Sequence, residues 1–118
     1  MVTLRAGEIL LAFIFIAGGL STLRNPMPRV EEIARLHFPF PALAVRVNAA
    51  MMMVAGAALA LNIQARLASG VLAVLLALTT AFGHAFWTEQ GPRRELQAVN
   101  FFKNLAILGG LLLVTQIR

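Results

Sequence analysis

The stretch LASGVLAVLLALTTAFGHAFW, residues 67–87, decides the fold, because it contains no Asp, Glu, Lys or Arg. At 1.5 Å per residue, a helix of this length spans about 30 Å, the thickness of the hydrocarbon core of a bilayer. The whole chain of 118 residues is 59% hydrophobic and 13% charged, with a mean hydropathy of +0.81. A soluble chain this small must leave much of its surface in water. We therefore predict that residues 1–118 form a single integral membrane domain.

Three further apolar segments complete the pattern: AGEILLAFIFIAGGLSTL (6–23), PALAVRVNAAMMMVAGAALAL (41–61) and NFFKNLAILGGLLLVTQI (100–117). We expect transmembrane helices over residues 5–24, 41–62, 66–87 and 99–117. The segments do not alternate in polarity, and lipid admits only helices or closed barrels. The sequence thus predicts an all-α fold, a four-transmembrane-helix bundle, held together by patches of glycine and alanine. The second helix reaches spanning length only if it begins near Pro41, a residue suited to a first helical turn.

The connecting segments differ in character. Between the first two spans, Val30, Ile33, Ala34 and Phe38 are spaced for one face of a short helix, with charges on the other face. This pattern predicts a short interfacial helix between helices 1 and 2. Residues 62–66 are too few to separate the helices they join, so these helices should be antiparallel neighbours. Residues 88–99 are polar and contain Gly91-Pro92, which predicts a turn.

The basic residues favour one side of the membrane. With four crossings both ends of the chain lie on one side, which we call side A; the opposite side is side B. Side B carries Arg24, Arg29, Arg35, Arg46, Arg93, Arg94 and Lys103, and side A carries Arg5, Arg66 and Arg118. The positive-inside rule then places side B in the cytoplasm. Because these residues flank apolar runs, nucleic-acid binding is not expected. On side A, Arg5 and Glu8 are three residues apart and are expected to form a local ion pair.

Polar side chains recur near the side-B end of all four predicted spans. A Lys or Arg deep in lipid costs about 2.5–3.5 kcal/mol on insertion scales, so several such groups at one depth are best placed facing each other and water. We predict a polar pocket that opens toward side B. Its candidate ligand-binding residues are Arg46, Asn48, Thr80, His84, Phe86, Trp87, Asn100, Lys103 and Asn104.

A simpler interpretation stays open. In it, Lys103 and Arg46 extend to the lipid headgroups, Trp87 belongs to the interfacial belt and His84 caps a helix. No nucleophile–base pair is visible, and no carboxylates stand at metal-ligand spacing. The chain has no cysteine. We therefore assign no catalytic residue, no metal site and no intrinsic cofactor, and whether the protein is an enzyme stays open.

Three motifs, RVNAAMMMVAGAALAL (46–61), TTAFGHAFW (79–87) and NFFKNLAILGGLLL (100–113), resemble the DoxX family of small four-helix bacterial membrane proteins. The resemblance extends over essentially the whole chain and implies a multi-pass protein of the bacterial inner (plasma) membrane. Its recurrent motif positions correspond here to His84, Phe86, Trp87, Asn100, Lys103 and Asn104. Family members often carry a glutamate in the second helix, followed by Gly-Gly. This chain reads NAAMMMVAG there, so no role of that glutamate is transferred.

The resemblance also suggests a function, because the family is associated with redox chemistry. We expect a redox-associated accessory subunit whose pocket binds a quinone or a similar small molecule. The alternative is a non-catalytic scaffold or interaction subunit of a membrane complex, which contacts lipids and either protein partners or further copies of itself. A small multidrug-type exporter would need a membrane-embedded carboxylate on the first helix. Glu8 is the only candidate there, and the absence of tyrosine leaves few aromatic residues to surround a cation.

Overall fold

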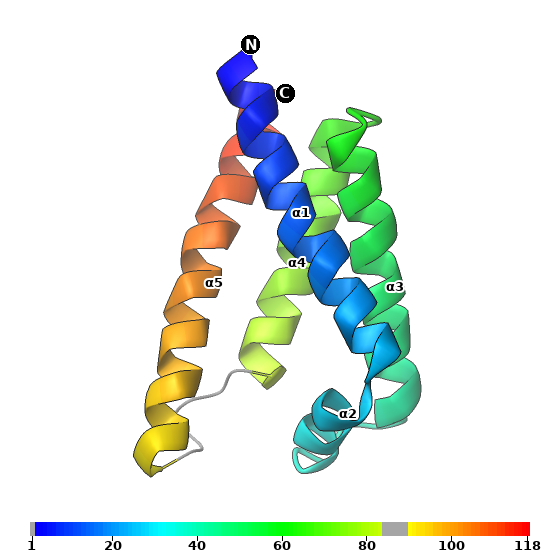
Figure 1. Ribbon diagram of the computed structural model, residues 1–118, viewed down its shortest axis with the longest axis vertical. Coiled ribbons are helices and arrows are strands. Elements are labelled where there is room, and N and C mark those ends of the chain that lie inside the picture. The colour runs from blue at the N-terminus through cyan, green and yellow to red at the C-terminus, as the bar shows by residue number, and fades with distance from the viewer. Residues whose placement is uncertain (1, 84–89) are drawn as a thin grey trace.

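The computed structural model describes residues 2–83 and 90–118, without the side chains of residues 82 and 83, and its regular structure there is entirely helical. Five helices are present in this part of the chain: α1 (Val2–Arg24), α2 (Met27–Ala34), α3 (Pro41–Ala60), α4 (Ala65–Gly83) and α5 (Gly91–Ile117) (Figure 1). The all-α prediction is confirmed, and so is the short helix between the first two long ones.

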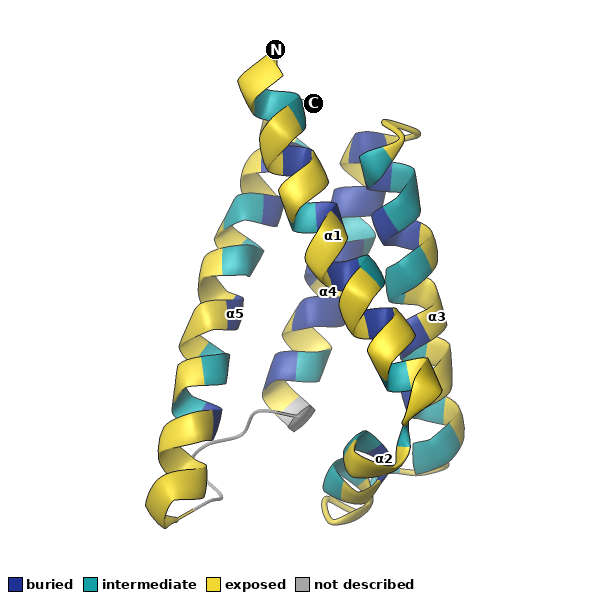
Figure 2. Cartoon of the chain, in the orientation of Figure 1, coloured by how far each residue is buried: buried dark blue, intermediate teal, exposed yellow. Residues whose placement is uncertain are grey.

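Three of these helices, α1, α3 and α5, are long and apolar enough to cross a membrane, and the apolar part of α4, Ala65–Ala81, is shorter. The longest dimension is 43 Å, which matches the roughly 40–45 Å of a bilayer with its headgroups. Large apolar side chains cover the outer faces of the helices, for example Phe13, Val54 and Leu113 (Figure 2). An apolar surface of this extent indicates contact with lipid.

The two ends of the molecule match the predicted sides. The start of α1, the end of α5 and the link between α3 and α4 lie together at one end, side A (Figure 1). The short helix α2 lies at the other end, side B.

Helices α1 and α3 approach each other so closely that a side chain would clash at Gly19 and would be tight at Gly56. A Cβ on Gly19 would lie 2.5 Å from Cγ of Met53 and 2.8 Å from the carbonyl oxygen of Ala49. A Cβ on Gly56 would lie 3.3 Å from the carbonyl oxygen of Ala12. Small residues permit such backbone contact between membrane helices, where association depends on close packing.

Helix α4 is the most buried helix, because it packs against both α3 and α5. It contributes more residues to the apolar core than any other helix. The buried core consists of Ala12, Phe15, Ala55, Leu59, Ala65, Ala68, Leu72, Ala73, Leu76, Leu111 and Val114. These residues belong to α1, α3, α4 and α5, so the four long helices share one core.

A buried ion cluster joins three helices at side A. The carboxylate of Glu8 is 0% exposed and accepts from Nη1 of Arg5 at 2.8 Å, which confirms the predicted ion pair. It also accepts from Nε of Arg118 at 2.8 Å and from the same guanidinium's Nη2. Hydrogen bonding to Glu8 raises the pKa of Arg118, so this arginine stays cationic. Arg5 also donates to the carbonyl oxygens of Leu59 at 3.2 Å and Ala60 at 2.5 Å. These oxygens belong to the last turn of α3, where the carbonyl groups lack the i+4 N–H partners of the helix interior.

The link between α3 and α4 is short because α3 ends in a tight left-handed turn. Asn62 has φ 58°. Its N–H donates to the carbonyl oxygen of Leu59 at 3.1 Å, and the N–H of Ile63 donates to that of Ala58 at 2.8 Å. This is a Schellman motif, and asparagine tolerates the left-handed conformation that it needs. The turn sends α4 back along α3, as predicted for antiparallel neighbours.

Two helices begin earlier in the sequence than the segments expected for them, and each has a proline in its first turn. Helix α5 begins at Gly91, not at residue 99, so most of the predicted polar loop is helical. Pro92 lies in the first turn, where its missing N–H is not needed. Pro28 likewise lies in the first turn of α2. This helix starts at Met27, before Val30, the first residue of the expected apolar face. His37, with φ 59°, marks the left-handed turn that follows α2. Pro41 does lie in the first turn of α3, as predicted.

We expect Gly19→Ala to destabilise the protein by about 1–3 kcal/mol, the usual cost of overpacking. The added methyl group would meet the backbone at Ala49, which cannot move aside easily. Gly18→Ala is the matched control, because a Cβ there meets nothing within 4 Å. Thermal unfolding of both variants in detergent, followed by circular dichroism, measures the difference. Equal stability of the two variants would contradict the close approach.

We expect Arg118→Gln to lower the free energy of unfolding by about 1–3 kcal/mol, because it removes two charged hydrogen bonds from a buried carboxylate. Arg66→Gln is the control, since Arg66 is an exposed arginine on the same side of the molecule. Denaturant titration of both variants provides the measurement. If Arg66→Gln were as damaging as Arg118→Gln, general loss of charge would explain the effect and the cluster would not.

Candidate functional site

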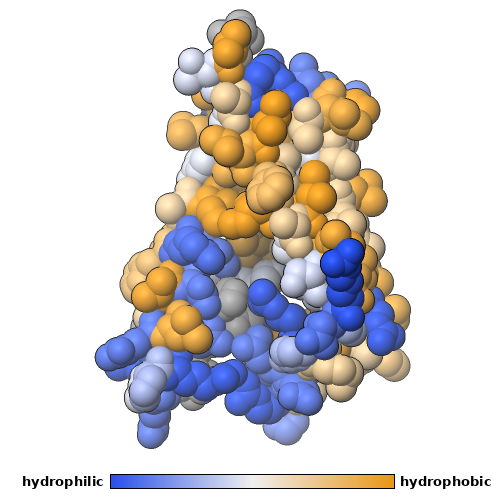
Figure 3. Space-filling model, in the orientation of Figure 1, coloured by the Kyte–Doolittle hydropathy of each residue, from blue (hydrophilic) through white to orange (hydrophobic). Residues whose placement is uncertain are grey.

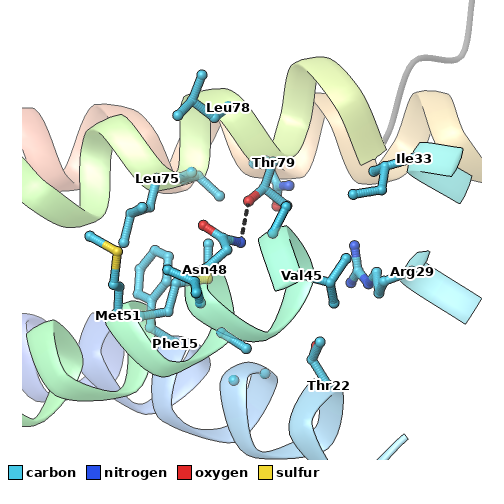
Figure 4. A pocket seen from close by; sticks show the side chains of 18 of the residues that line it. Phe15, Thr22, Arg29, Ile33, Val45, Asn48, Met51, Leu75, Leu78 and Thr79 are labelled. Atoms are coloured by element: carbon cyan, nitrogen blue, oxygen red, sulfur yellow. Dashed lines mark hydrogen bonds between the residues drawn. The ribbon is translucent and has the colours of Figure 1, made fainter. Parts of the chain in front are cut away.

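A cavity of about 500 Å³ lies in the side-B half of the molecule, and all five helices contribute to its walls. Figure 3 shows the hollow between α5 on one side and α1 and α2 on the other, bordered by hydrophilic residues. Most of its lining is apolar, including Ile14, Phe15, Ile33, Val45, Met51, Leu75 and Ile107 (Figure 4). Its polar members are Thr22, Arg29, Glu32, Asn48, Thr79, Lys103 and Asn104.

The pairing of the helices explains why this half is open. Helix α1 packs mainly against α3, and α5 packs mainly against α4. Helices α1 and α5 meet at side A, where Glu8 binds Arg118 and where a Cβ added to Gly110 would lie in ordinary contact with Leu11. Toward side B they diverge (Figure 1). The resulting space becomes the cavity.

Two amides bridge helices in and beside the pocket. Nδ2 of Asn48 on α3 donates to Oγ1 of Thr79 on α4 at 3.0 Å (Figure 4). Nδ2 of Asn104 on α5 donates to the buried Oγ1 of Thr80 on α4 at 3.1 Å. Each amide keeps a second N–H and a carbonyl oxygen, and each threonine keeps its hydroxyl proton. The bridges therefore hold the helices in place and leave neutral donors and acceptors for a ligand.

Three ionisable side chains line the same pocket: Arg29 and Glu32 from α2, and Lys103 from α5. Oε1 of Glu32 accepts from Nε2 of Gln97 at 3.0 Å and from Nη2 of Arg93 at 3.4 Å. These bonds connect α2 to α5. Among the described residues, neither Arg29 nor Lys103 makes a hydrogen bond or an ion pair. Within the described part of the chain, the pocket thus has two cations without a partner and one paired anion.

The structure brings three of the predicted candidates together, since Asn48, Lys103 and Asn104 all line the pocket. Thr80 is buried beside them and bonds to Asn104. Arg46 is exposed and Asn100 is half-buried, and neither is part of the lining. The candidates His84, Phe86 and Trp87 lie outside the described residues.

Four polar lining residues were not among the candidates: Thr22, Arg29, Glu32 and Thr79. The two on α2 were assigned to the charged face of an amphipathic helix at the membrane interface. Their spacing of three residues, which places Arg29 and Glu32 on one face, was the available signal. The apolar Ile33 lines the pocket with them, so α2 presents a mixed face to the cavity.

The described lining of the pocket has groups that can hold a small molecule. Among the described residues, no group of three or more histidine, aspartate or glutamate side chains could hold a metal ion. The pocket offers amide, hydroxyl and cationic groups next to an apolar wall. Such a set orients a small molecule that has a polar head and an apolar body.

Apolar helices of spanning length and a pocket at one end define a small, helical, multi-pass membrane protein. The DoxX family model matches residues 4–85. The chain is 31% identical over 114 residues to the inner membrane protein YphA of Escherichia coli (strain K12), covering 96% of this chain and 81% of YphA. The chain therefore belongs to the DoxX family and is a multi-pass protein of the bacterial inner membrane. The family match ends before the 100–113 motif. No solved structure shows a significant match to the chain.

We expect Asn104→Leu and Thr80→Val to be coupled in a double-mutant cycle, because they share one buried hydrogen bond. The coupling free energy should be about 0.5–1.5 kcal/mol, with the double variant less unstable than the sum of the singles. Asn100→Leu is the control, since Asn100 lies one turn away on α5 and forms no hydrogen bond with a described residue. Denaturant unfolding of the set in detergent measures the coupling. Strict additivity of Asn104→Leu and Thr80→Val would contradict the bridge.

Proposed function

We propose that the long helices form a four-transmembrane-helix bundle whose side-B pocket binds a quinone or a similar small molecule, as an accessory subunit of a redox system. The fourth crossing in this proposal is α4, which has 19 residues and is therefore about 28 Å long. Its place between α3 and α5 supports the assignment, because both neighbours have the length and composition of membrane spans.

The observation that carries the ligand proposal is the cavity itself. Its volume of about 500 Å³ lies in the range of small-molecule sites, which are mostly apolar with a few polar groups that orient the ligand. A quinone ring fits against the apolar wall near Phe15 and Met51. Its carbonyl oxygens would accept hydrogen bonds from the free N–H groups of Asn48 and Asn104, and its tail would extend into lipid between α1 and α5.

The role of a subunit fits the chemistry of the described site. The pocket supplies groups that bind and orient, with no nucleophile next to a base. The chain has no cysteine, so any thiol chemistry in this proposal belongs to a partner. We accordingly assign ligand binding to this chain and electron transfer to a protein that it contacts in the membrane.

A pocket-filling substitution tests the proposal. Gly18 lies between Ile14 and Thr22 on the row of α1 that lines the pocket, and a Cβ there meets nothing within 4 Å. Gly18→Leu should therefore fill the cavity without a clash and weaken binding of a ubiquinone or menaquinone analogue at least about tenfold. Gly7→Leu is the matched control on the same helix, because Gly7 is equally open but does not line the pocket. Titration of the purified protein with the analogue gives both affinities.

Equal affinity for the wild type, Gly18→Leu and Gly7→Leu would overturn the pocket assignment. The scaffold interpretation would then be favoured, in which the protein stabilises other subunits or a further copy of itself. In that case, partners that co-purify with the wild type should also co-purify with Gly18→Leu.

A further inference from the structure

Arg29 and Lys103 are the two charged groups in the pocket that have no partner among the described residues. They come from α2 and α5, which are far apart in the sequence, yet both line the same cavity. Glu32 is the acid among the described lining residues, and it is bonded to Gln97 and Arg93 and forms no ion pair with either cation. The ionisable lining groups, two cations and one anion, therefore carry a formal net charge of +1.

We propose that the pocket selects amphiphiles whose head is an anionic oxygen group, and that Arg29 and Lys103 bind this head. The inference rests on the proposed function, because it specifies the chemical class of ligand that the same pocket takes. Arg29 is partly buried and Lys103 is exposed, and both border a mainly apolar wall, beside which the attraction between a cation and an anion is stronger than in bulk water. Charge-assisted hydrogen bonds to a carboxylate or phosphate are also about twice as strong as neutral ones.

Extension toward lipid headgroups is the competing account of these cations, because long basic side chains near helix ends commonly reach the interface. That account requires no shared space between Arg29 and Lys103. The structure places them around one cavity, together with the amide groups of Asn48 and Asn104. A ligand head needs several polar groups around one space, and this cavity provides two cations with neutral donors beside them.

The remaining walls determine the body of the ligand. They are mainly apolar, and the cavity opens between α1 and α5, whose outer faces carry apolar side chains (Figures 2 and 3). A small hydrophilic anion could contact Arg29 and Lys103 but would leave the apolar walls unoccupied, so it would gain nothing from burial of apolar surface. An amphiphile that enters from the bilayer satisfies both parts of the pocket, with its chain against the apolar wall and its head near Arg29 and Lys103.

The test uses the full chain in nanodiscs of phosphatidylcholine, with radiolabelled palmitate as the probe. Measurement at about pH 9 keeps the carboxyl group ionised beside the bilayer, where desolvation raises its pKa. We expect Lys103→Gln and Arg29→Gln each to weaken palmitate binding about tenfold or more, the effect of losing a charged hydrogen bond. Lys103→Arg should restore most of the affinity. Arg46→Gln, which removes an exposed cation outside the pocket, should bind like the wild type.

Competing compounds separate the parts of the proposal. Methyl palmitate, which has the same chain without the charge, should compete poorly. Acetate and inorganic phosphate, which have the charge without the chain, should also compete poorly, whereas dodecyl phosphate should compete well. Equal competition by palmitate and methyl palmitate would overturn the anion selectivity. Strong competition by acetate or phosphate would show a small-anion site instead and would also overturn the inference.

The same preparation separates this inference from the proposed function. If a quinone analogue binds and Gly18→Leu abolishes that binding, but palmitate neither binds nor competes, the inference fails and the pocket assignment stands. If Gly18→Leu affects neither ligand, both fail. If palmitate binding depends on Lys103, Arg29 and Gly18 while the quinone analogue does not bind, the anion-selective pocket stands and the quinone proposal fails.

Discussion

The backbone contact between α1 and α3 is the constraint on which the other arrangements depend. Lipid tails are as apolar as leucine, so helices in a membrane gain little from hydrophobicity when they associate and depend on close packing. Gly19 and Gly56 provide that packing, because their missing side chains let two backbones meet. Once α1 lies against α3, it cannot also follow α5 along its whole length. The open space between α1 and α5 is thus a consequence of the tightest contact in the protein.

The two halves of the molecule consequently differ in what fills them. Toward side A, Leu59 and Leu111 are fully buried, and the ion cluster around Glu8 joins α1, α3 and α5. This half is closed by apolar packing and by a carboxylate whose neighbours are both cationic. Toward side B, the helices are bridged by single amide–hydroxyl hydrogen bonds and by the contact of Glu32 with α5. Such bridges fix helix positions without filling the volume between them.

The helices were predictable from local features of the sequence. The length of an apolar run, the start of α3 at Pro41 and the short link before α4 are each set by residues that are close together in the chain. The candidate pocket was predictable only in part. Asn48, Lys103 and Asn104 were found because each lies near the same end of its span. Arg118 and Glu8 are 110 residues apart, and no periodicity links residues at that distance. The inward face of α2 depends on tertiary contacts with α3 and α4, which override the usual rule that charges point away from the protein.

The basic residues at the two ends of the molecule illustrate how one residue type serves two purposes. At side A, Arg5 and Arg118 donate hydrogen bonds to the Glu8 carboxylate, and Arg5 also donates to the terminal carbonyl groups of α3. Both charges therefore help to hold the helices together. At side B, Arg29 and Lys103 line a cavity and make no hydrogen bond or ion pair with any residue that the structure describes. Replacing a paired cation leaves a buried carboxylate undercompensated and costs stability. Arg29 and Lys103 have no partner among the described residues, so replacing either of them leaves no described group unpaired. The effect of the replacement should therefore fall on ligand binding and not on folding.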